Sequence, residues 1–342
     1  MKRIEEKKGH KAWWIWGVLC LLAAGIVLAV CVGKYPVSPG ESLKIIVNSI
    51  LGLDTGAPEM TENVVLGLRI PRILASVVVG AALSMSGAAY QGIFKNPLVS
   101  PDFLGVSSGA CIGAALAILL SLTTAYISIF AFIGGIVAVI ITVSIPALMR
   151  NRSNIMLVLS GIIVGTAMSS ILGFLKYIAD PNTQLASITY WTMGSFSYIT
   201  LNDLLVVLPL IIVPMVILIL MAWWIDVLSM GEEEAKALGA RVGAIRGVAI
   251  LCSTLLTAAS VCIAGTISWV GLIVPHFGRM LVGPSNRKII PLCGALGGLF
   301  MLVVDTLTRT IAITEMPVSI LTGAIGAPIF CWLLFRQRRD GQ

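Results

Sequence analysis

The sequence predicts an all-α polytopic membrane protein with ten transmembrane helices. Of its 342 residues, 58% are hydrophobic and only 11% are charged, against roughly 45–50% and 25% in soluble globular domains. The apolar residues fall into ten runs, each close to or somewhat below the ~20 residues that a helix needs to cross the hydrocarbon layer. We therefore expect membrane lipid around the chain. We divide the chain into membrane spans and not into globular domains.

The ten apolar runs are spread along the whole chain. A basic segment, residues 1–12, precedes the first run, which is long for a signal peptide and lacks an A-x-A cleavage pattern. The runs cover residues 13–33, 69–91, 104–121, 125–148, 155–175, 204–224, 247–264, 266–281, 290–308 and 317–335. The eighth is the weakest, because Pro275, His276 and Arg279 interrupt it.

The distribution of basic residues favours ten spans over nine. With ten spans and a cytoplasmic N-terminus, 17 of the 23 lysines and arginines lie on the cytoplasmic side, as the positive-inside rule requires. Without the eighth span the division becomes 11 inside against 12 outside. We therefore expect both termini in the cytoplasm, and we attribute the net charge of +7 to membrane orientation and not to nucleic-acid binding.

Small residues inside the runs indicate close packing between helices. Glycines stand four residues apart at Gly109/Gly113, Gly161/Gly165 and Gly294/Gly298, a spacing that lets helix backbones approach each other in membranes. The seven cysteines mostly lie inside apolar runs, and no C-x-x-C pair occurs. We expect them to be buried apolar side chains that form neither a disulfide framework nor a metal site.

The most charged internal stretch is the loop of residues 225–246, between the sixth and seventh runs. Ser229 and Glu232 have the spacing of a capping box. The acids Glu232, Glu233 and Glu234 suit the positive end of a helix dipole, and Gly239 stands where a left-handed residue would end a helix. The pattern predicts a short helix over 229–239, on the cytoplasmic side. It is either a solvated loop or a docking helix for a soluble partner.

Groups for catalysis or ion coupling are scarce. His10 lies in the basic N-terminal segment. His276 has no acidic or cysteine neighbour at metal-ligand spacing, so it is expected to be a hydrogen-bonded structural residue. No phosphate-binding glycine motif occurs. All sixteen acids lie in loops or near span ends, with Asp305 the deepest, whereas ion-coupled carriers keep such groups deep in their spans. We expect the chain to have neither enzyme activity nor a cofactor. We expect the energy for transport to come from another polypeptide.

A series of motifs runs from about Leu66 to Phe335. They are LRIPR (68–72), GAALS (80–84), QGIFKNPL (91–98), GVSSG (105–109), YWTMGSF (190–196), LSMGEEEAKALG (228–239), VGLIVPH (270–276), Arg279, LVGP (281–284) and GAP (326–328). Together and in this order they resemble the FecCD family, the permease subunits of binding-protein-dependent ABC importers for iron–siderophores, haem and vitamin B12.

The resemblance implies an ABC importer permease fold with inverted halves, in which spans two to five match spans seven to ten. A weak repeat agrees with this, because Gly87 precedes Pro97, and Gly265 precedes Pro275, by the same ten residues. Residues 1–342 would form one permease domain, with 1–12 as its cytoplasmic N-terminus and 225–246 as its ATPase-coupling loop. The implied partners are two cytoplasmic ATPase subunits, an extracytoplasmic substrate-binding protein, and a second permease copy or a related permease.

The resemblance also gives roles to residues on the cytoplasmic side. Those that would sit in a groove of the ATPase are Glu232, Glu233, Ala235, Leu238 and Gly239, as a helix-in-groove contact. Asn96 and Leu98 match a cytoplasmic gate of the vitamin B12 importer, although Asn96-Pro97 could also be an ordinary turn.

Three arginines on the outer side match residues that receive the binding protein. Arg69 and Arg72 match arginines that bind glutamates of the binding protein in the vitamin B12 importer. Arg309 resembles a third, although it precedes Glu315 by six residues instead of the family's usual seven. The alternative for Arg69 and Arg72 is that they anchor a span end in the lipid headgroups.

The sequence-based hypothesis is a permease of the bacterial cytoplasmic membrane that moves a bulky metal chelate inward, driven by ATP hydrolysis on partner subunits. An iron–siderophore is the first choice of cargo. Haem, cobalamin and molybdate stay open, as does the choice between a homodimer and a heterodimer. The alternatives of other classes are an ion-coupled secondary transporter, and a scaffold that binds an ATPase without moving a cargo.

Overall fold

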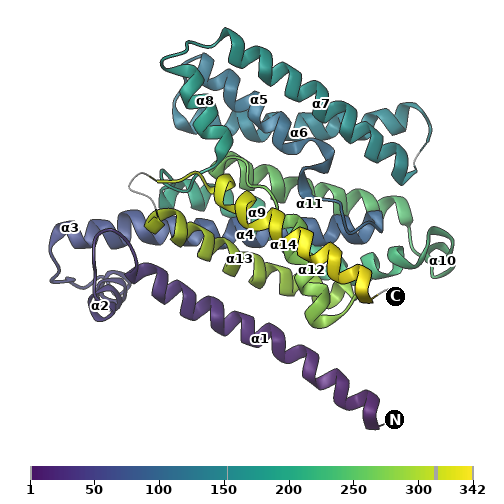
Figure 1. The fold of residues 1–342 in the computed structure, drawn as a ribbon, viewed down its shortest axis with the longest axis horizontal. Coiled ribbons are helices and arrows are strands. Elements are labelled where there is room, and N and C mark those ends of the chain that lie inside the picture. Colours follow the sequence, from purple (N-terminus) through teal and green to yellow (C-terminus); the bar gives the residue numbers. More distant parts are fainter. Residues whose placement is uncertain (1, 152, 312–314, 341–342) are drawn as a thin grey trace.

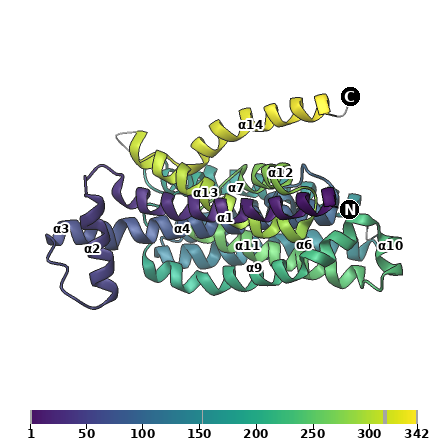
Figure 2. The ribbon, with the colours of Figure 1, turned by 90° about the horizontal axis from the view of Figure 1, so that it is seen from below.

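In the computed structural model, residues 2–151, 153–311 and 315–340 are described, and within these ranges the chain forms helices and no β-strand (Figure 1). The all-α fold class that the sequence predicts is confirmed. The helices run roughly along a common direction and form one elongated bundle (Figure 2).

Ten of the helices correspond one by one to the ten apolar runs. They are α1 (Lys2–Cys31), α4 (Ile70–Phe94), α5 (Val106–Leu119), α6 (Thr124–Leu148), α7 (Asn154–Ile178), α9 (Leu201–Met230), α11 (Val242–Ala264), α12 (Val270–Val282), α13 (Asn286–Ile311) and α14 (Val318–Asp340). Among the described residues, seven helices are long and apolar enough to cross a bilayer, and the apolar parts of α5, α12 and α14 are shorter. The count of ten spans therefore stays a prediction.

The remaining elements are shorter. They are α2 (Pro39–Ile50), α3 (Glu59–Glu62), the π-helix η1 (Asn63–Arg69), the 3-10 helix η2 (Pro101–Leu104), α8 (Gln184–Met193) and α10 (Glu232–Ala237). Figures 1 and 2 show α2 and α3 at one end, and α10 at the other end together with the described N- and C-terminal residues. The described residues nearest the two chain ends therefore lie on one side of the bundle, as an even number of membrane crossings requires. We call the end with α2 and α3 the outer end and the end with α10 the inner end.

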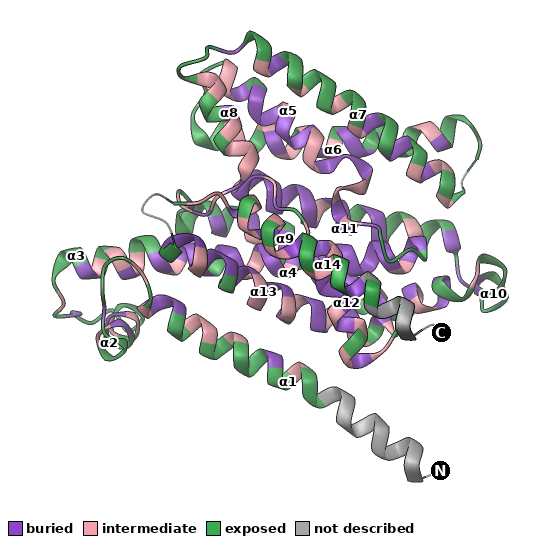
Figure 3. Cartoon of the chain, viewed as in Figure 1, coloured by how far each residue is buried: buried purple, intermediate pink, exposed green. Residues whose placement is uncertain are grey.

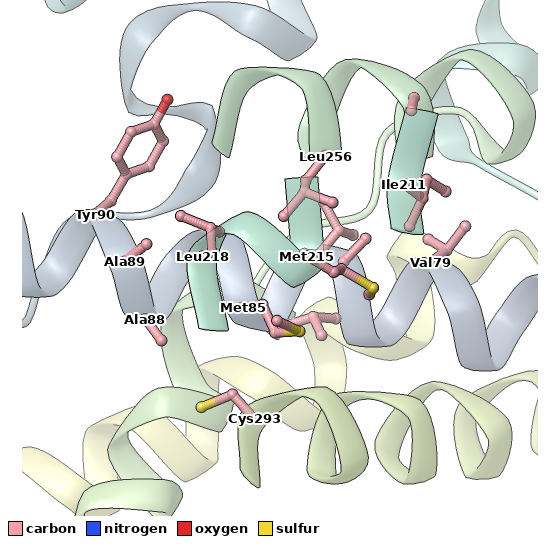
Figure 4. Close-up of a cluster of buried hydrophobic side chains, with 14 of the residues drawn as sticks. Val79, Met85, Ala88, Ala89, Tyr90, Ile211, Met215, Leu218, Leu256 and Cys293 are labelled. Carbon is pink, nitrogen blue, oxygen red and sulfur yellow. The ribbon is translucent and has the colours of Figure 1, made fainter. Parts of the chain in front are cut away.

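The core is built around α4, of whose 25 residues 19 are buried. In Figure 4, Val79, Met85 and Ala88 of α4 lie among side chains of α9, α11 and α13. Glycine makes part of this packing possible, because a Cβ at Gly87 would collide with the backbone carbonyl group of Gly271 in α12. Figure 3 shows many exposed positions along α1 and α7. The exposed residues of α1, α7 and α9 are largely apolar, as expected of helices in contact with lipid or with a partner subunit.

The predicted glycine pairs have mixed outcomes. Gly109 and Gly113 of α5 pack against the backbone of α6 at Gly134 and Phe130, which confirms them as close-contact sites. Gly165 of α7, by contrast, has open space where its Cβ would be.

The glycine–proline repeat does not mark equivalent positions. Gly87 lies inside α4 and Pro97 in the loop after it, whereas Gly265 ends α11 and Pro275 lies inside α12. The use of this glycine–proline repeat as evidence for inverted halves is therefore wrong.

The cysteines also differ in part from the prediction. Cys111, Cys252, Cys262 and Cys293 are buried, as expected, but Cys20 and Cys331 are exposed. An apolar sequence environment means contact with lipid as readily as contact with the core, which explains the difference.

Candidate functional sites at the two ends of the bundle

The three predicted docking arginines lie close together at the outer end. Arg69 is the last residue of η1, Arg72 lies in the first turn of α4, and Arg309 lies in the last turn of α13. All three are buried, with 5%, 6% and 8% of their surface exposed. We call Arg69, Arg72, Arg309, Asp305 and Glu315 the outer charge cluster.

Arg72 is held between two carboxylates. Its Nε donates to Oδ1 of Asp305 at 2.8 Å, and its Nη1 donates to Oε1 of Glu315 at 2.8 Å. Weaker contacts reach Ser197 Oγ at 3.3 Å and Thr308 Oγ1 at 3.4 Å. The two carboxylates differ in accessibility, because the Asp305 side chain is fully buried and that of Glu315 is 44% exposed.

Arg69 and Arg309 hold the C-terminal end of α1. Nη1 of Arg69 donates to the carbonyl oxygen of Val30 at 2.6 Å, and its Nη2 donates to that of Tyr35. Nη2 of Arg309 donates to the carbonyl oxygen of Ala29 at 3.3 Å. The last carbonyl groups of a helix lack partners within the helix and carry partial negative charge, so two guanidinium groups stabilise them. These two arginines thus have a structural role that the sequence did not reveal.

Asp305 is the centre of the outer charge cluster. Its Oδ1 pairs with Arg72, and its Oδ2 lies 3.3 Å from Nε of Arg309. One fully buried carboxylate therefore sits between two buried arginines. A buried ion is tolerated only when such partners compensate for the loss of water.

The inner end carries the predicted coupling helix, and its start differs from the prediction. α9 continues to Met230, so Ser229 lies in its last turn and donates to the carbonyl oxygen of Asp226 at 2.6 Å. The N-cap of α10 is Gly231, without a side-chain cap, so the predicted capping box is wrong. Gly239 has φ +80°, which confirms it as the left-handed residue after the helix.

The side chains of the coupling loop divide into buried and exposed ones. Ala235 is fully buried and packs in a small apolar cluster with Val227, Leu228, Ala240, Val242 and Ile245. Glu232 pairs with Arg246, whose charged hydrogen bond lowers the pKa of Glu232 below its ordinary value. Glu233 pairs with Lys236 at 2.8 Å on the exposed face, and Leu238 is 56% exposed.

The predicted gate residues form a turn after α4. Lys95, with φ 52°, ends the helix in the left-handed conformation. Asn96 Oδ1 then accepts a hydrogen bond from the backbone N–H of Leu98 at 2.9 Å, so the ordinary-turn geometry is present. His276 Nε2 lies 3.1 Å from the carbonyl oxygen of Pro97, which confirms His276 as a hydrogen-bonded structural residue. Leu98 is exposed.

A second polar contact that the sequence did not predict fixes the same turn. Gln91 Nε2 donates to the carbonyl oxygens of Val99 at 3.2 Å and Leu272 at 3.3 Å. Its Oε1 accepts from Nη1 of Arg279 at 2.6 Å. In the sequence, Gln91 stands at the end of one apolar run and Arg279 interrupts another. No local pattern indicates that these two side chains are in contact.

Comparison with known proteins identifies the family. The model of the FecCD transport family matches residues 21–336. The chain is 37% identical to the molybdate import system permease protein MolB of Haemophilus influenzae, over 96% of either chain. It is 36% identical to a probable iron chelatin transport system permease protein of Helicobacter pylori, over 80% of this chain and 83% of the relative.

Among solved structures, one that is ascribed to a metal-chelate type ABC transporter, in an inward-facing conformation, is similar at a TM-score of 0.84. It has 34% sequence identity, and the match covers 94% of this chain and 98% of the other. The relatives named for an iron chelate and for molybdate have nearly the same sequence identity, 36% and 37%. Identity alone therefore does not select the cargo. The chain belongs to the FecCD transport family and is a membrane permease of an ABC importer.

Proposed function

We propose that this permease takes up an iron–siderophore or a similar metal chelate across the bacterial cytoplasmic membrane, driven by ATP hydrolysis on partner subunits. The observation that carries the proposal is the likeness, over 94% of the chain, to a solved structure that is ascribed to a metal-chelate type ABC transporter. The probable iron chelatin permease of Helicobacter pylori supports the same cargo class.

Molybdate is the second candidate cargo. The observation in its favour is the 37% identity to MolB, over 96% of this chain. Haem and cobalamin are further members of the cargo range that the family resemblance implies.

The surroundings of Asp305 favour an ATP-driven importer over an ion-coupled carrier. A coupling site needs a carboxylate that can bind and release an ion. Asp305, the deepest acid of the sequence, is fully buried and paired with Arg72 and Arg309. A carboxylate held by two cations is a poor site for a third.

We assign contact with an ATPase subunit to α10 and its flanks. Glu233 and Leu238 supply the exposed side chains, and Glu232 is partly exposed beside Arg246. Ala235 and Gly239 act indirectly, because Ala235 fixes the helix to the apolar cluster beneath it and Gly239 ends the helix. A short helix with an apolar anchor and an exposed charged face suits insertion into a groove.

The gate at Asn96 and Leu98 lies near this coupling helix. Lys95 is close enough to Glu232 for its charge to contribute to the lowered pKa of that carboxyl group. A displacement of α10 by the ATPase would therefore change the electrostatic surroundings of the turn that contains the gate residues. This proximity supports a mechanism in which closure of the ATPase dimer changes access to the transport pathway.

At the outer end, we assign docking of a substrate-binding protein to the arginines. Arg72 is the principal residue of this site, because its second carboxylate partner is solvent-accessible. Arg69 and Arg309 support it by holding α1 beside the site.

Uptake into proteoliposomes tests the proposal. The permease is reconstituted with the ATPase and binding protein encoded beside it, and radiolabelled ferric siderophore, haem, cobalamin and molybdate are compared. ATP-dependent uptake of a ferric chelate supports the proposal, whereas uptake of molybdate alone replaces it by the second candidate. Uptake that follows an ion gradient without ATP contradicts the ATP-driven mechanism, and ATPase binding without uptake of any cargo supports the scaffold.

A further inference from the structure

The partners of the three outer arginines differ in how easily they can be exchanged. Arg69 binds backbone carbonyl oxygens, and Arg309 binds backbone carbonyl oxygens together with the buried Asp305. These partners are fixed parts of the fold. Arg72 alone links the buried Asp305 to a carboxylate that reaches solvent, that of Glu315.

Glu315 lies in the connection between α13 and α14 and is held by side chains of other elements. Its Oε1 accepts from Arg72 of α4, and its Oε2 accepts from Ser197 Oγ, in the connection between α8 and α9. Ser195 Oγ lies 2.7 Å from Ser197 Oγ and supports it. Through one carboxylate, three separate parts of the chain are tied together at the outer end.

We propose that Glu315 is an internal occupant of the docking site, in the position that a carboxylate of the substrate-binding protein takes on docking. The inference rests on the docking role proposed for Arg72. In the free permease Glu315 neutralises Arg72, and on docking the partner's carboxylate replaces it. The exchange leaves the buried guanidinium paired at every stage.

The exposure of the two carboxylates determines which of them is exchanged. Releasing Asp305 would leave a fully buried charge without a partner, which is costly. Releasing Glu315 costs little, because its side chain is already 44% exposed and regains water. Glu315 is therefore the partner that leaves.

The exchange also has a consequence for the helices behind the site. The start of α14 is held to the same region, since the N–H of Val318 donates to the carbonyl oxygen of Gly194 at 3.0 Å. Loss of the Glu315 contacts removes the link from Arg72 and Ser197 to this start. Docking is thereby transmitted to α14 and to the connection between α8 and α9.

The test measures the affinity of the binding protein for the assembled transporter in nanodiscs. Glu315→Gln removes the competing charge, so the Kd is expected to fall about two- to fivefold, the range for an exposed ion pair. Ser197→Ala, which loosens Glu315 without removing it, is expected to give a smaller decrease. The matched control is Glu59→Gln, which removes an exposed charge of α3 at the same end and is expected to leave the Kd unchanged.

Arg72→Gln separates the two proposals. If Arg72→Gln leaves the Kd unchanged, the docking role itself is wrong. If Arg72→Gln weakens binding while Glu315→Gln binds like the parent or more weakly, docking stands and the competition by Glu315 is wrong. The competition also requires that Glu315→Gln has no effect in the Arg72→Gln background, because the two changes act on one contact. Thermal unfolding of each variant, compared with the parent, shows whether the fold is retained.

Discussion

The two ends of the bundle present charge in opposite ways. At the outer end, three arginines are almost fully buried and are paired within the fold. At the inner end, the charged residues of α10 lie on an exposed face, and the apolar side of the helix is anchored to a small cluster. In the proposed assembly, a partner contacts the inner end directly, but at the outer end it has to displace Glu315 from Arg72 first.

This difference has a physical consequence for each interface. An exposed ion pair contributes roughly 0–1 kcal/mol, so charges at the inner end affect the rate and orientation of association more than they affect stability. A buried pair cannot lose one member without leaving an uncompensated charge. Substitutions of the buried residues in the outer charge cluster should therefore affect folding, and substitutions of the exposed residues at the inner end should affect assembly.

Removal of the Asp305 charge should have the largest effect on stability, and it tests the difference between the two ends most strongly. Asp305→Asn leaves Arg72 and Arg309 buried with a much weaker partner, and we expect a loss of stability of about 3–5 kcal/mol. Unfolding in detergent, followed by heat or denaturant, measures it. Glu59→Gln serves as the control for the loss of one acidic charge. A variant that unfolds like the parent would mean that the two arginines find compensation elsewhere.

Replacement of Arg69 probes the structural part of the outer charge cluster. Arg69→Gln loses charge-assisted hydrogen bonds to the carbonyl groups of Val30, in the last turn of α1, and Tyr35, which follows the helix, each worth about 1.5–3 kcal/mol. We expect faster hydrogen exchange over residues 29–35, measured by mass spectrometry, together with reduced stability. Exchange that is unchanged in this segment would contradict the clamp on α1.

At the inner end, a change of Leu238 should spare the fold and impair assembly. Leu238→Arg places a charge at an exposed apolar position of the coupling loop, and we expect about a tenfold loss of affinity for the ATPase. Titration of the ATPase onto the solubilised permease measures it. The control is Leu51→Arg, at a leucine of similar exposure at the outer end, which should leave this affinity unchanged. If the two variants bind the ATPase with equal affinity, α10 does not form part of the interface with the ATPase.

The pH dependence of the inner end should be the smallest effect. Arg246 lowers the pKa of Glu232 in the folded state. The ion pair therefore stabilises α10 fully above the ordinary pKa of the carboxyl group, and this contribution is lost as the pH falls through the lowered value. We expect less than about 1 kcal/mol, because the pair is partly exposed. Hydrogen exchange of α10 between pH 7 and pH 3 should show the loss in the parent and not in Arg246→Gln.

Local patterns of the sequence predicted the helices well and the charge pairing poorly. Apolar runs are local, and each of the ten became a helix. The acids at the start of α10 and the left-handed Gly239 are local signals as well. The pairing of Arg72 with Asp305, by contrast, joins residues 233 positions apart, which no local pattern reveals.

The wrong capping box has a tertiary cause. Val227 and Leu228 are buried against the loop that follows α9, so packing extends α9 past Ser229 and moves the start of α10 to Glu232. Propensity and capping signals are weak compared with such packing. The Gln91–Arg279 contact at the gate turn was missed for a related reason, because it links two helices 188 residues apart.

The most direct measurement of the central claim is ATP hydrolysis by the complete transporter in nanodiscs, with and without binding protein. The account predicts that the binding protein stimulates hydrolysis in the parent. It also predicts that this stimulation is lost in both Arg72→Gln, at the outer end, and Leu238→Arg, at the inner end. Stimulation that persists in both variants, or cargo uptake that needs an ion gradient and no ATP, would contradict it.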